Sequence, residues 1–439
     1  MLKERGARLH AAMDIVIPQR NWSRPEIEAH QWRQLKALVE HAYANVPMYR
    51  CKYDAAGFQP EHLKSLADLE LIPLLTKEEL RGASSKDLKD RNGHPGYRWL
   101  QSSGSTGMPA GIWRDEGSLW HFMAQNTALY YEWCQGSPID KVLYFLDMAQ
   151  DSIDYALADL LRTVTAEERI VSVTAPVEEH LAKMGELQPE FISSYPSAMR
   201  SIAMLMRQRG MQNERLKLLH LTSEMLNQRT RDLLAEVFPH ARVIETYTST
   251  ESGLIAWECL HDKRWHLAET GVIGEILTQR GGPADGTGRL IITDLTNWAT
   301  PVIRYAGLGD LCAWETSPCP CGSLLRSLCQ MQGRVADILI RRDGTGVSPY
   351  RVTNALDEVA GICQYQVVQH VSHDFEVFAI PNASLALPVD RIASDIRNAL
   401  ATVMGEEHQC EIRWVSPLSP KANRHKVSLV TCHLQEGIS

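Results

Sequence analysis

The chain has 439 residues and lacks several features that would place it in particular classes of protein. No apolar run approaches the roughly 18 residues that a membrane-spanning helix needs. The amino-terminal segment, MLKERGARLHAAMDIVIPQR, has an apolar stretch too short and too interrupted for a secretory signal peptide. Lys and Arg number 45 against 53 Asp and Glu, and nucleic-acid binding depends on the opposite excess. We therefore expect a cytoplasmic protein that binds neither membranes nor nucleic acid.

The composition is that of a folded globular protein. Hydrophobic residues make up 44% and charged residues 22%, which excludes a wholly disordered, collagenous or disulfide-scaffold chain. There are ten cysteines, and without an export signal they are expected to be reduced thiols. Most of them are predicted to be small core residues. One group, around residues 312–329, is dense enough to indicate chemistry.

The central part of the chain alternates between apolar strand candidates and helical stretches. Between residues 98 and 335 the strand candidates include VLYFLDM, FISSYP and RVIETYT, and PSAMRSIAMLMRQRG is typical of a helix. Such alternation predicts an α/β domain with a largely parallel sheet. From about residue 265 the pattern changes to short strands separated by Gly- and Pro-bearing turns. There, GEILTQRGGPADGTGRLIITDL predicts a β-hairpin with a long polar loop.

The remaining chain predicts a second, smaller unit. From about residue 334 onward, short β and α segments follow one another, as in YRVTNALDEVA, DFEVFAIP and DRIASDIRNALATVM. We therefore expect an α/β protein with two domains. The large amino-terminal domain covers residues 1–333 and has parallel-sheet α/β layers with a β-rich part at about 265–333. The small carboxyl-terminal domain covers residues 334–439 and is α+β.

A first candidate site is the segment Gln101–Pro109, QSSGSTGMP. Two glycines and four hydroxyl residues make a loop that offers backbone N–H groups and short O–H donors, as a phosphate site requires. It is not a Walker loop, because the GK[ST] ending is missing. A surface linker rich in Ser and Gly is the alternative interpretation.

A second candidate is Ile244–Glu251, IETYTSTE, where a strand ends in a hydroxyl-rich turn closed by a carboxylate. The aromatic ring could stack on a base, and Glu251 could hold a Mg²⁺ ion that bridges phosphates. A strand end followed by a helix N-cap is the alternative.

Two further segments carry charged residues in suggestive positions. DLTNWATPVIRY, residues 294–305, is followed by Gly309–Asp310, and an acid on a tight Gly turn can bind both ribose hydroxyls. An ordinary turn is the alternative. Near the carboxyl terminus, Pro420–Lys421 precedes Arg424–Val427, RHKV, and such a basic group is usually a solvated surface.

Together these segments resemble the AMP-forming acyl/aryl ligase superfamily, and within it the phenylacetate–coenzyme A ligase-like family. SSGSTGMP is similar to the family's phosphate loop, and Tyr247–Glu251 to its YGxTE box. Residues 293–310 are similar to its TDLxxxxxPxIRYxxGD stretch, Gly333–Asp337 to its GRxxD hinge, and Pro420–Lys426 to its PRTxxGK ending. The resemblance covers nearly the whole chain, with five motifs in the family's order.

The resemblance implies roles for individual residues. Lys426, Thr250 and Glu251 would be catalytic, with Lys421 as the alternative lysine if the alignment shifts. Asp337 would be the hinge of a mobile carboxyl-terminal domain. The residues that would bind ATP or AMP are Ser102, Ser103, Gly104, Ser105, Thr106, Gly107, Ser223, Glu224, Glu245, Thr246, Tyr247, Asp310 and Arg334.

A possible metal site involves four residues from two loops: Cys259, His266, Cys319 and Cys321. A Cys3His set would complete the tetrahedral coordination of a structural Zn²⁺. Several members of the family show a similar pattern. Reduced cysteines and a surface histidine are the alternative interpretation, although a CxC pair at a Pro-bearing turn is hard to explain as core packing. His261 is the reserve ligand.

The expected activity is ATP- and Mg²⁺-dependent activation of a carboxylic acid to an acyl-adenylate, followed by thioester formation with coenzyme A. The alternatives are delivery of the acyl group to a separate carrier protein or an amine, and a non-catalytic nucleotide-binding descendant. Four aromatic residues, Tyr144, Phe145, Tyr155 and Tyr195, could line an acid pocket and favour an aromatic acid, or could belong to the core. A monomer or a homodimer is expected.

Overall fold

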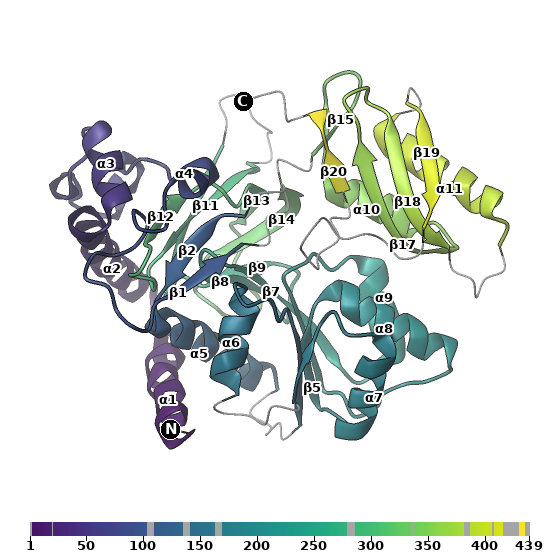
Figure 1. Ribbon diagram of the computed structural model, residues 1–439, viewed down its shortest axis with the longest axis horizontal. Coiled ribbons are helices and arrows are strands. Elements are labelled where there is room, and N and C mark those ends of the chain that lie inside the picture. The colour runs from purple at the N-terminus through teal and green to yellow at the C-terminus, as the bar shows by residue number, and fades with distance from the viewer. Residues whose placement is uncertain are drawn as a thin grey trace.

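The computed structural model describes residues 2–19, 21–102, 109–134, 141–162, 169–278, 286–334, 338–381, 387–405, 408–415 and 430–434. Within these residues it has a large domain with one long mixed sheet and a smaller domain that follows residue 338 (Figure 1). This agrees with the expected α/β fold and its small α+β carboxyl-terminal part. No helix of the described residues is both long enough and apolar enough to span a membrane.

Five parallel strands form one half of the long sheet, in the order β7-β6-β5-β3-β4. Their bounds are β3 (Val142–Leu146), β4 (Ile170–Ser172), β5 (Phe191–Ser194), β6 (Leu218–Thr222) and β7 (Arg242–Ser249). All residues of β5 are buried, as expected of a strand covered on both faces.

Helices cover both faces of the parallel strands. Figure 1 shows α5 (Glu116–Trp133) and α6 (Ile153–Leu161) on one side and α7 (Val177–Leu187), α8 (Pro196–Gln208) and α9 (Gln228–Val237) on the other. Consecutive residues of a strand alternate between the two cores. Phe191 packs with α5, whereas Ile192 packs with α7 and α8.

The antiparallel half of the sheet continues from β7 without a break, in the order β10-β11-β13-β14-β9-β8-β7, with β12 paired to β11. The predicted β-rich part is therefore an extension of the parallel sheet. The bounds are β8 (Gly253–Glu258), β9 (Trp265–Leu267), β10 (Val272–Leu277), β11 (Gly288–Asp294), β12 (Val302–Tyr305), β13 (Asp310–Glu315) and β14 (Ser327–Arg334). The predicted hairpin is β10–β11, with Val272 opposite Asp294.

The amino-terminal helices enclose a core of their own against β12. Tyr49 is fully buried there, and its hydroxyl donates a hydrogen bond to the Pro301 carbonyl at 2.8 Å. The elements are α2 (Arg24–Asn45), α3 (Pro47–Ala55), the 3₁₀ turns η1 (Pro60–His62) and η2 (Leu66–Leu71), α4 (Lys77–Gly82) and the hairpin β1 (Arg98–Gln101) with β2 (Gly111–Arg114). The first helix, α1 (Leu2–Gln19), packs on α5 instead. Thr76 and Glu79 form a capping box that begins α4.

The second domain has a four-stranded sheet in the order β19-β18-β17-β20, with α10 and α11 packed on it. Its elements are the hairpin β15 (Leu339–Ile340) and β16 (Gly346–Val347), α10 (Pro349–Asp357), β17 (Ile362–Gln369), β18 (Phe375–Pro381), α11 (Val389–Met404), β19 (Cys410–Trp414) and β20 (Val430–Cys432). The buried residues of this core all lie between 339 and 432, so the domain has a hydrophobic core separate from that of the sheet.

Candidate active site

The predicted site residues gather at the carboxyl ends of the parallel strands. Tyr195 follows β5, Ser223 and Glu224 follow β6, and Thr250 and Glu251 follow β7. Carboxyl ends of parallel strands meet at one edge of a sheet, where open α/β proteins bind their ligands. The fold therefore brings residues from well-separated motifs to a single edge.

A buried arginine fixes the turn after β7. Arg114, at the end of β2, is 1% exposed, and its Nη1 donates to the Thr250 carbonyl at 3.2 Å. Its Nη2 lies 3.2 Å from the carboxylate of Asp294, which is fully buried at the end of β11. The pKa of Asp294 is raised, because burial raises it by more than the charge of Arg114 lowers it. The sequence analysis missed Arg114, because no motif surrounds it.

Glu251 is held by the segment that leads to Asp310. The Glu251 carboxylate is 5% exposed and accepts a hydrogen bond from the Tyr305 hydroxyl at 3.2 Å. A Cβ at Gly307 would lie 2.4 Å from the Tyr305 ring, so the chain can pass that ring only with glycine. The carboxylate is thus fixed at the edge of the sheet.

Tyr247 and Asp310, the predicted adenine and ribose residues, are in direct contact. The Tyr247 hydroxyl donates a hydrogen bond to the Asp310 carboxylate. Asp310 begins β13 directly after Gly309, whose φ of +76° is in the left-handed region that favours glycine. The backbone of Arg334 lies opposite Asp310 in the β13–β14 ladder. The structure therefore brings these three predicted nucleotide residues together.

The segment predicted to bind phosphate begins and ends on a hairpin. Ser102 is 8% exposed; its N–H donates to the Ala110 carbonyl at 2.8 Å, and its Oγ accepts from the Ala110 N–H at 3.1 Å. The two chain ends of the loop are therefore held together at the base of β1–β2. The predicted residues that lie outside the described residues are Ser103, Gly104, Ser105, Thr106, Gly107, Asp337, Lys421 and Lys426.

The turn after β6 is strained and charged. Ser223 has a φ of +71°, which is uncommon for a residue with a side chain and persists only where its surroundings fix it. The Glu224 carboxylate accepts a hydrogen bond from the Ser197 N–H at 2.9 Å, at the amino end of α8. A carboxylate is favourable at that end of a helix, so Glu224 joins β6 to α8.

Two predicted nucleotide residues of β7 make hydrogen bonds within the protein. The Glu245 carboxylate accepts from Arg231 Nη2 at 2.8 Å and from the Leu226 N–H at 3.1 Å. Thr246 Oγ1 lies 2.8 Å from Nε2 of His220, whose pKa burial lowers to about 3. The structure places both side chains in internal hydrogen-bond networks.

The four aromatic residues proposed for the acid pocket lie in different surroundings. Tyr195 is 5% exposed and donates to the Asp154 carboxylate at 2.5 Å, next to Tyr155 on α6. Tyr144 packs on the α5 face of the sheet, and burial raises its pKa to about 12. Phe145 is fully buried on the opposite face, 4.5 Å from the His180 ring. Tyr144, Tyr155 and Tyr195 are thus the members near the carboxyl edge.

The four predicted metal ligands meet at one point. Cys259 follows β8, His266 lies in β9, and Cys319 and Cys321 lie between β13 and β14. Their ligand atoms are all within 4.8 Å of one another. His266 Nε2 is 3.4 Å from Cys319 Sγ and 3.3 Å from Cys321 Sγ, and Cys259 Sγ is 3.5 Å from Cys319 Sγ. Ligands of one tetrahedral zinc ion are separated by roughly these distances.

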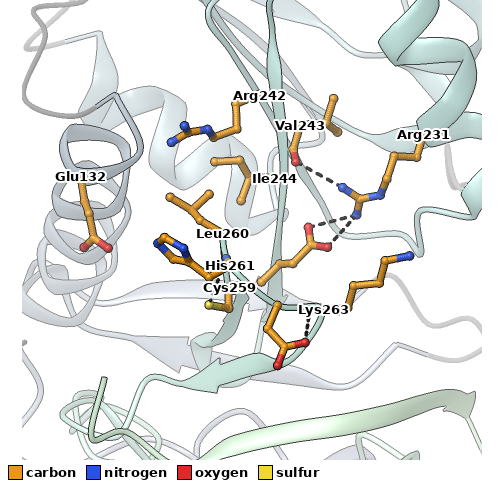
Figure 2. A pocket seen from close by; sticks show the side chains of 11 residues that line it. Glu132, Arg231, Arg242, Val243, Ile244, Cys259, Leu260, His261 and Lys263 are labelled. Carbon is orange, nitrogen blue, oxygen red and sulfur yellow. Dashed lines mark hydrogen bonds and ion pairs between the residues drawn. The ribbon is translucent and has the colours of Figure 1, made fainter. Parts of the chain in front are cut away.

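A cavity of about 710 Å³ lies at the other end of β7 (Figure 2). Its lining includes Arg242, which begins β7, and Cys259 of the metal cluster. Figure 2 shows Arg231 reaching the Val243 carbonyl, and the same side chain is paired with Glu258 at 3.0 Å. Because Tyr247 lies near the opposite end of β7 and Thr250 and Glu251 lie beyond it, this cavity is separate from that part of the candidate active site.

Three comparisons with known proteins agree with this arrangement. The profile of the AMP-binding enzyme family matches residues 70–280. A phenylacetate–coenzyme A ligase of Escherichia coli strain K12 is 30% identical over 338 residues, which cover 74% of each chain. A 2-hydroxyisobutyryl-CoA ligase in the postadenylation state has a TM-score of 0.75 at 19% identity, with 94% of this chain and 91% of the other covered.

The same ligase in its thioesterification state, with CoA bound, has a TM-score of 0.58 at 18% identity, covering 95% of this chain and 93% of the other. By this measure the present structure is more similar to the postadenylation structure than to the thioesterification structure.

The buried Arg114–Asp294 pair predicts a large loss of stability for Arg114→Met. That change leaves the Asp294 carboxylate buried and uncompensated, which costs about 3–5 kcal/mol. Urea denaturation should show this loss as a lower midpoint for Arg114→Met than for wild type. Arg209→Met is the matched control, since the Arg209–Glu178 pair is exposed at 3.9 Å and contributes about 0–1 kcal/mol. Equal denaturation midpoints for the two variants would contradict a central role for the pair.

Glu245 predicts a pH-dependent stability. Burial, with the nearby charge of Glu258, raises its pKa to about 8. The folded protein therefore holds this proton where the unfolded chain has lost it, so the free energy of unfolding falls as pH rises from about 4.5 to 8. Glu245→Gln should flatten this slope, and between pH 5 and pH 9 it should gain about 1.4 kcal/mol or more relative to wild type. Exposed Glu214→Gln should leave the slope unchanged, and an unchanged slope in Glu245→Gln would refute the assignment.

Proposed function

Because this chain belongs to the phenylacetate–coenzyme A ligase family of AMP-binding enzymes and is therefore an adenylate-forming acid–CoA ligase, we propose that its acid substrate is aromatic. The acid's carboxylate attacks the α-phosphate of ATP, and pyrophosphate leaves. The thiol of coenzyme A then attacks the acyl carbon of the mixed anhydride, and AMP leaves. The observation that carries the assignment of the site is the gathering of Tyr247, Glu251 and Asp310 at the carboxyl edge of the sheet.

The nucleotide would occupy this edge. Tyr247 would lie against adenine, and Asp310 would accept hydrogen bonds from the ribose hydroxyls. The phosphates would be bound by the loop of residues 102–107, whose two ends the hydrogen bonds between Ser102 and Ala110 hold together. Backbone N–H groups and hydroxyls in such a loop match phosphate oxygens. Arg334 would lie beside the ribose, because its backbone is opposite Asp310 in the β13–β14 ladder.

Glu251 and Thr250 would bind the Mg²⁺ ion and the phosphates. A carboxylate that is 5% exposed and fixed by Tyr305 is a hard oxygen ligand of the kind that Mg²⁺ prefers. The ion would offset phosphate charge when bound. Arg114 contributes by fixing the Thr250 backbone, and with it the position of the turn.

The preference for an aromatic acid rests on the tyrosines near the same edge. Tyr195 and Tyr155 lie beside Asp154, and Tyr144 precedes the end of β3. Apolar and aromatic side chains are the usual lining of small-molecule pockets. Phe145, in the core on the opposite face of the sheet, is not part of this pocket.

We further propose that Cys259, His266, Cys319 and Cys321 bind a structural Zn²⁺ ion. Three thiol sulfurs and one imidazole nitrogen, all within 4.8 Å, match a closed tetrahedral site. Nδ1 of His266 lies 3.2 Å from Ser327 Oγ, a partner that orients the ring as outer ligands of zinc sites do. The ion would join β8 and β9 to the β13–β14 connection.

The first test is carboxylate-dependent ATP–pyrophosphate exchange with phenylacetate and with a straight-chain acid, then product analysis with coenzyme A. We expect exchange with the aromatic acid and a CoA thioester as product. Lys426→Ala should reduce exchange roughly 100-fold, as expected for an electrostatic contact worth about 3 kcal/mol in the transition state. Lys421→Ala is the matched control. If Lys421→Ala is inactive and Lys426→Ala is not, the catalytic lysine is Lys421.

The zinc proposal predicts about one zinc ion per chain in protein purified without a polyhistidine tag, measured by elemental analysis. Cys321→Ser should lower the melting temperature more than it lowers exchange per folded molecule, since a closed site contributes to folding and not to the reaction. Cys51→Ser, at an exposed cysteine outside the cluster, is the control. Metal-free protein with an unchanged melting temperature in Cys321→Ser would refute the proposal.

A further inference from the structure

Among the described residues, polar side chains join the second domain to α8 and α9 of the large domain. Figure 1 shows it beside these helices. Arg229 Nη1, on α9, donates to the Val359 carbonyl at 3.1 Å. Gln364 Nε2, on β17, donates to Ser201 Oγ, on α8, at 3.1 Å. These four residues are called the interdomain contact below.

Arg229 binds at the carboxyl end of a helix in the other domain. Val359 lies in the turn that follows α10, two residues beyond Asp357, where the helix ends. Val359 is 5% exposed. A guanidinium is a favourable partner there, because it offsets the negative end of the helix dipole and makes a charge-assisted hydrogen bond.

A buried carboxylate strengthens the same contact. Asp357 is 3% exposed; its Oδ1 accepts from the Tyr365 hydroxyl at 2.9 Å, while its Oδ2 has no hydrogen-bond partner among the described residues. The pKa of Asp357 is raised by burial, and the charges of Arg200 and Arg229 offset part of this effect. Arg200 is held beside α9 by a 3.1 Å hydrogen bond to Thr230 Oγ1. Two guanidinium groups of the large domain therefore offset the charge of a carboxylate in the small one.

We propose that Arg229 is a positioning residue that favours the present domain arrangement, which is similar to a postadenylation structure, over the arrangement that forms the thioester. The inference rests on the proposed function. A rotation of the small domain away from α8 and α9 has to break the Arg229–Val359 and Gln364–Ser201 hydrogen bonds and to separate Asp357 from its two cations. A contact of so few polar groups can bias the equilibrium and still open in each cycle.

The test measures the two half-reactions separately by single-turnover kinetics: pyrophosphate release without coenzyme A, and thioester formation from preformed acyl-adenylate. Arg229→Ala should lower the ratio of the first rate to the second by about three- to tenfold, tenfold being about 1.4 kcal/mol of preference. Gln364→Ala should shift it in the same direction by less. Arg215→Ala, at an exposed arginine of the large domain, should leave it at the wild-type value.

An equal change of both rates in Arg229→Ala, or an unchanged ratio, would overturn the inference. If wild-type protein gives no exchange with either acid, the proposed function fails. The interdomain contact is then tested separately, by small-angle X-ray scattering of the unliganded protein. A larger radius of gyration in Arg229→Ala and Gln364→Ala than in Arg215→Ala supports the contact. Identical scattering of all three overturns it.

Discussion

The buried ion pair between Arg114 and Asp294 is the interaction on which the candidate active site depends. Both side chains are almost completely removed from water, so each charge is costly unless the other is present. The pair links β2, at the end of the phosphate-loop hairpin, to β11 in the antiparallel half of the sheet. Through the Thr250 carbonyl it also reaches the turn after β7. Three separate motifs are thus fixed relative to one another by one guanidinium group.

The continuity of the sheet places two candidate sites at opposite edges of neighbouring strands. β7 is the last parallel strand and the first to pair with an antiparallel one. Its carboxyl end carries Tyr247 and leads to Glu251, where the parallel strands end together. The strand that follows, β8, returns to the opposite edge and places Cys259 in the metal cluster. The candidate active site and the Cys/His cluster are therefore separated by the length of one strand.

Features that depend on neighbouring residues could be predicted from the sequence. The β10–β11 hairpin follows from a polar loop between two apolar runs, and it is present with Val272 opposite Asp294. The Cys/His set was predicted from spacing within two loops, and its ligand atoms do meet. Arg114 could not be predicted, because its partner is 180 positions away and a single arginine in a strand carries no local signal. Glu245 illustrates the same limit: its hydrogen bond to Arg231 of α9 joins residues that no local pattern connects.

The distribution of the metal cluster along the chain sets an order of assembly during synthesis. Its four residues lie between Cys259 and Cys321, on segments joined through β8, β9 and β14. All of them leave the ribosome before residues 338–434, which form the second domain. Domains of a growing chain generally fold as units from the amino-terminal side. The cluster can therefore assemble within the large domain while the second domain is still being made, which shortens the period in which these thiols are unpaired on an unfolded chain.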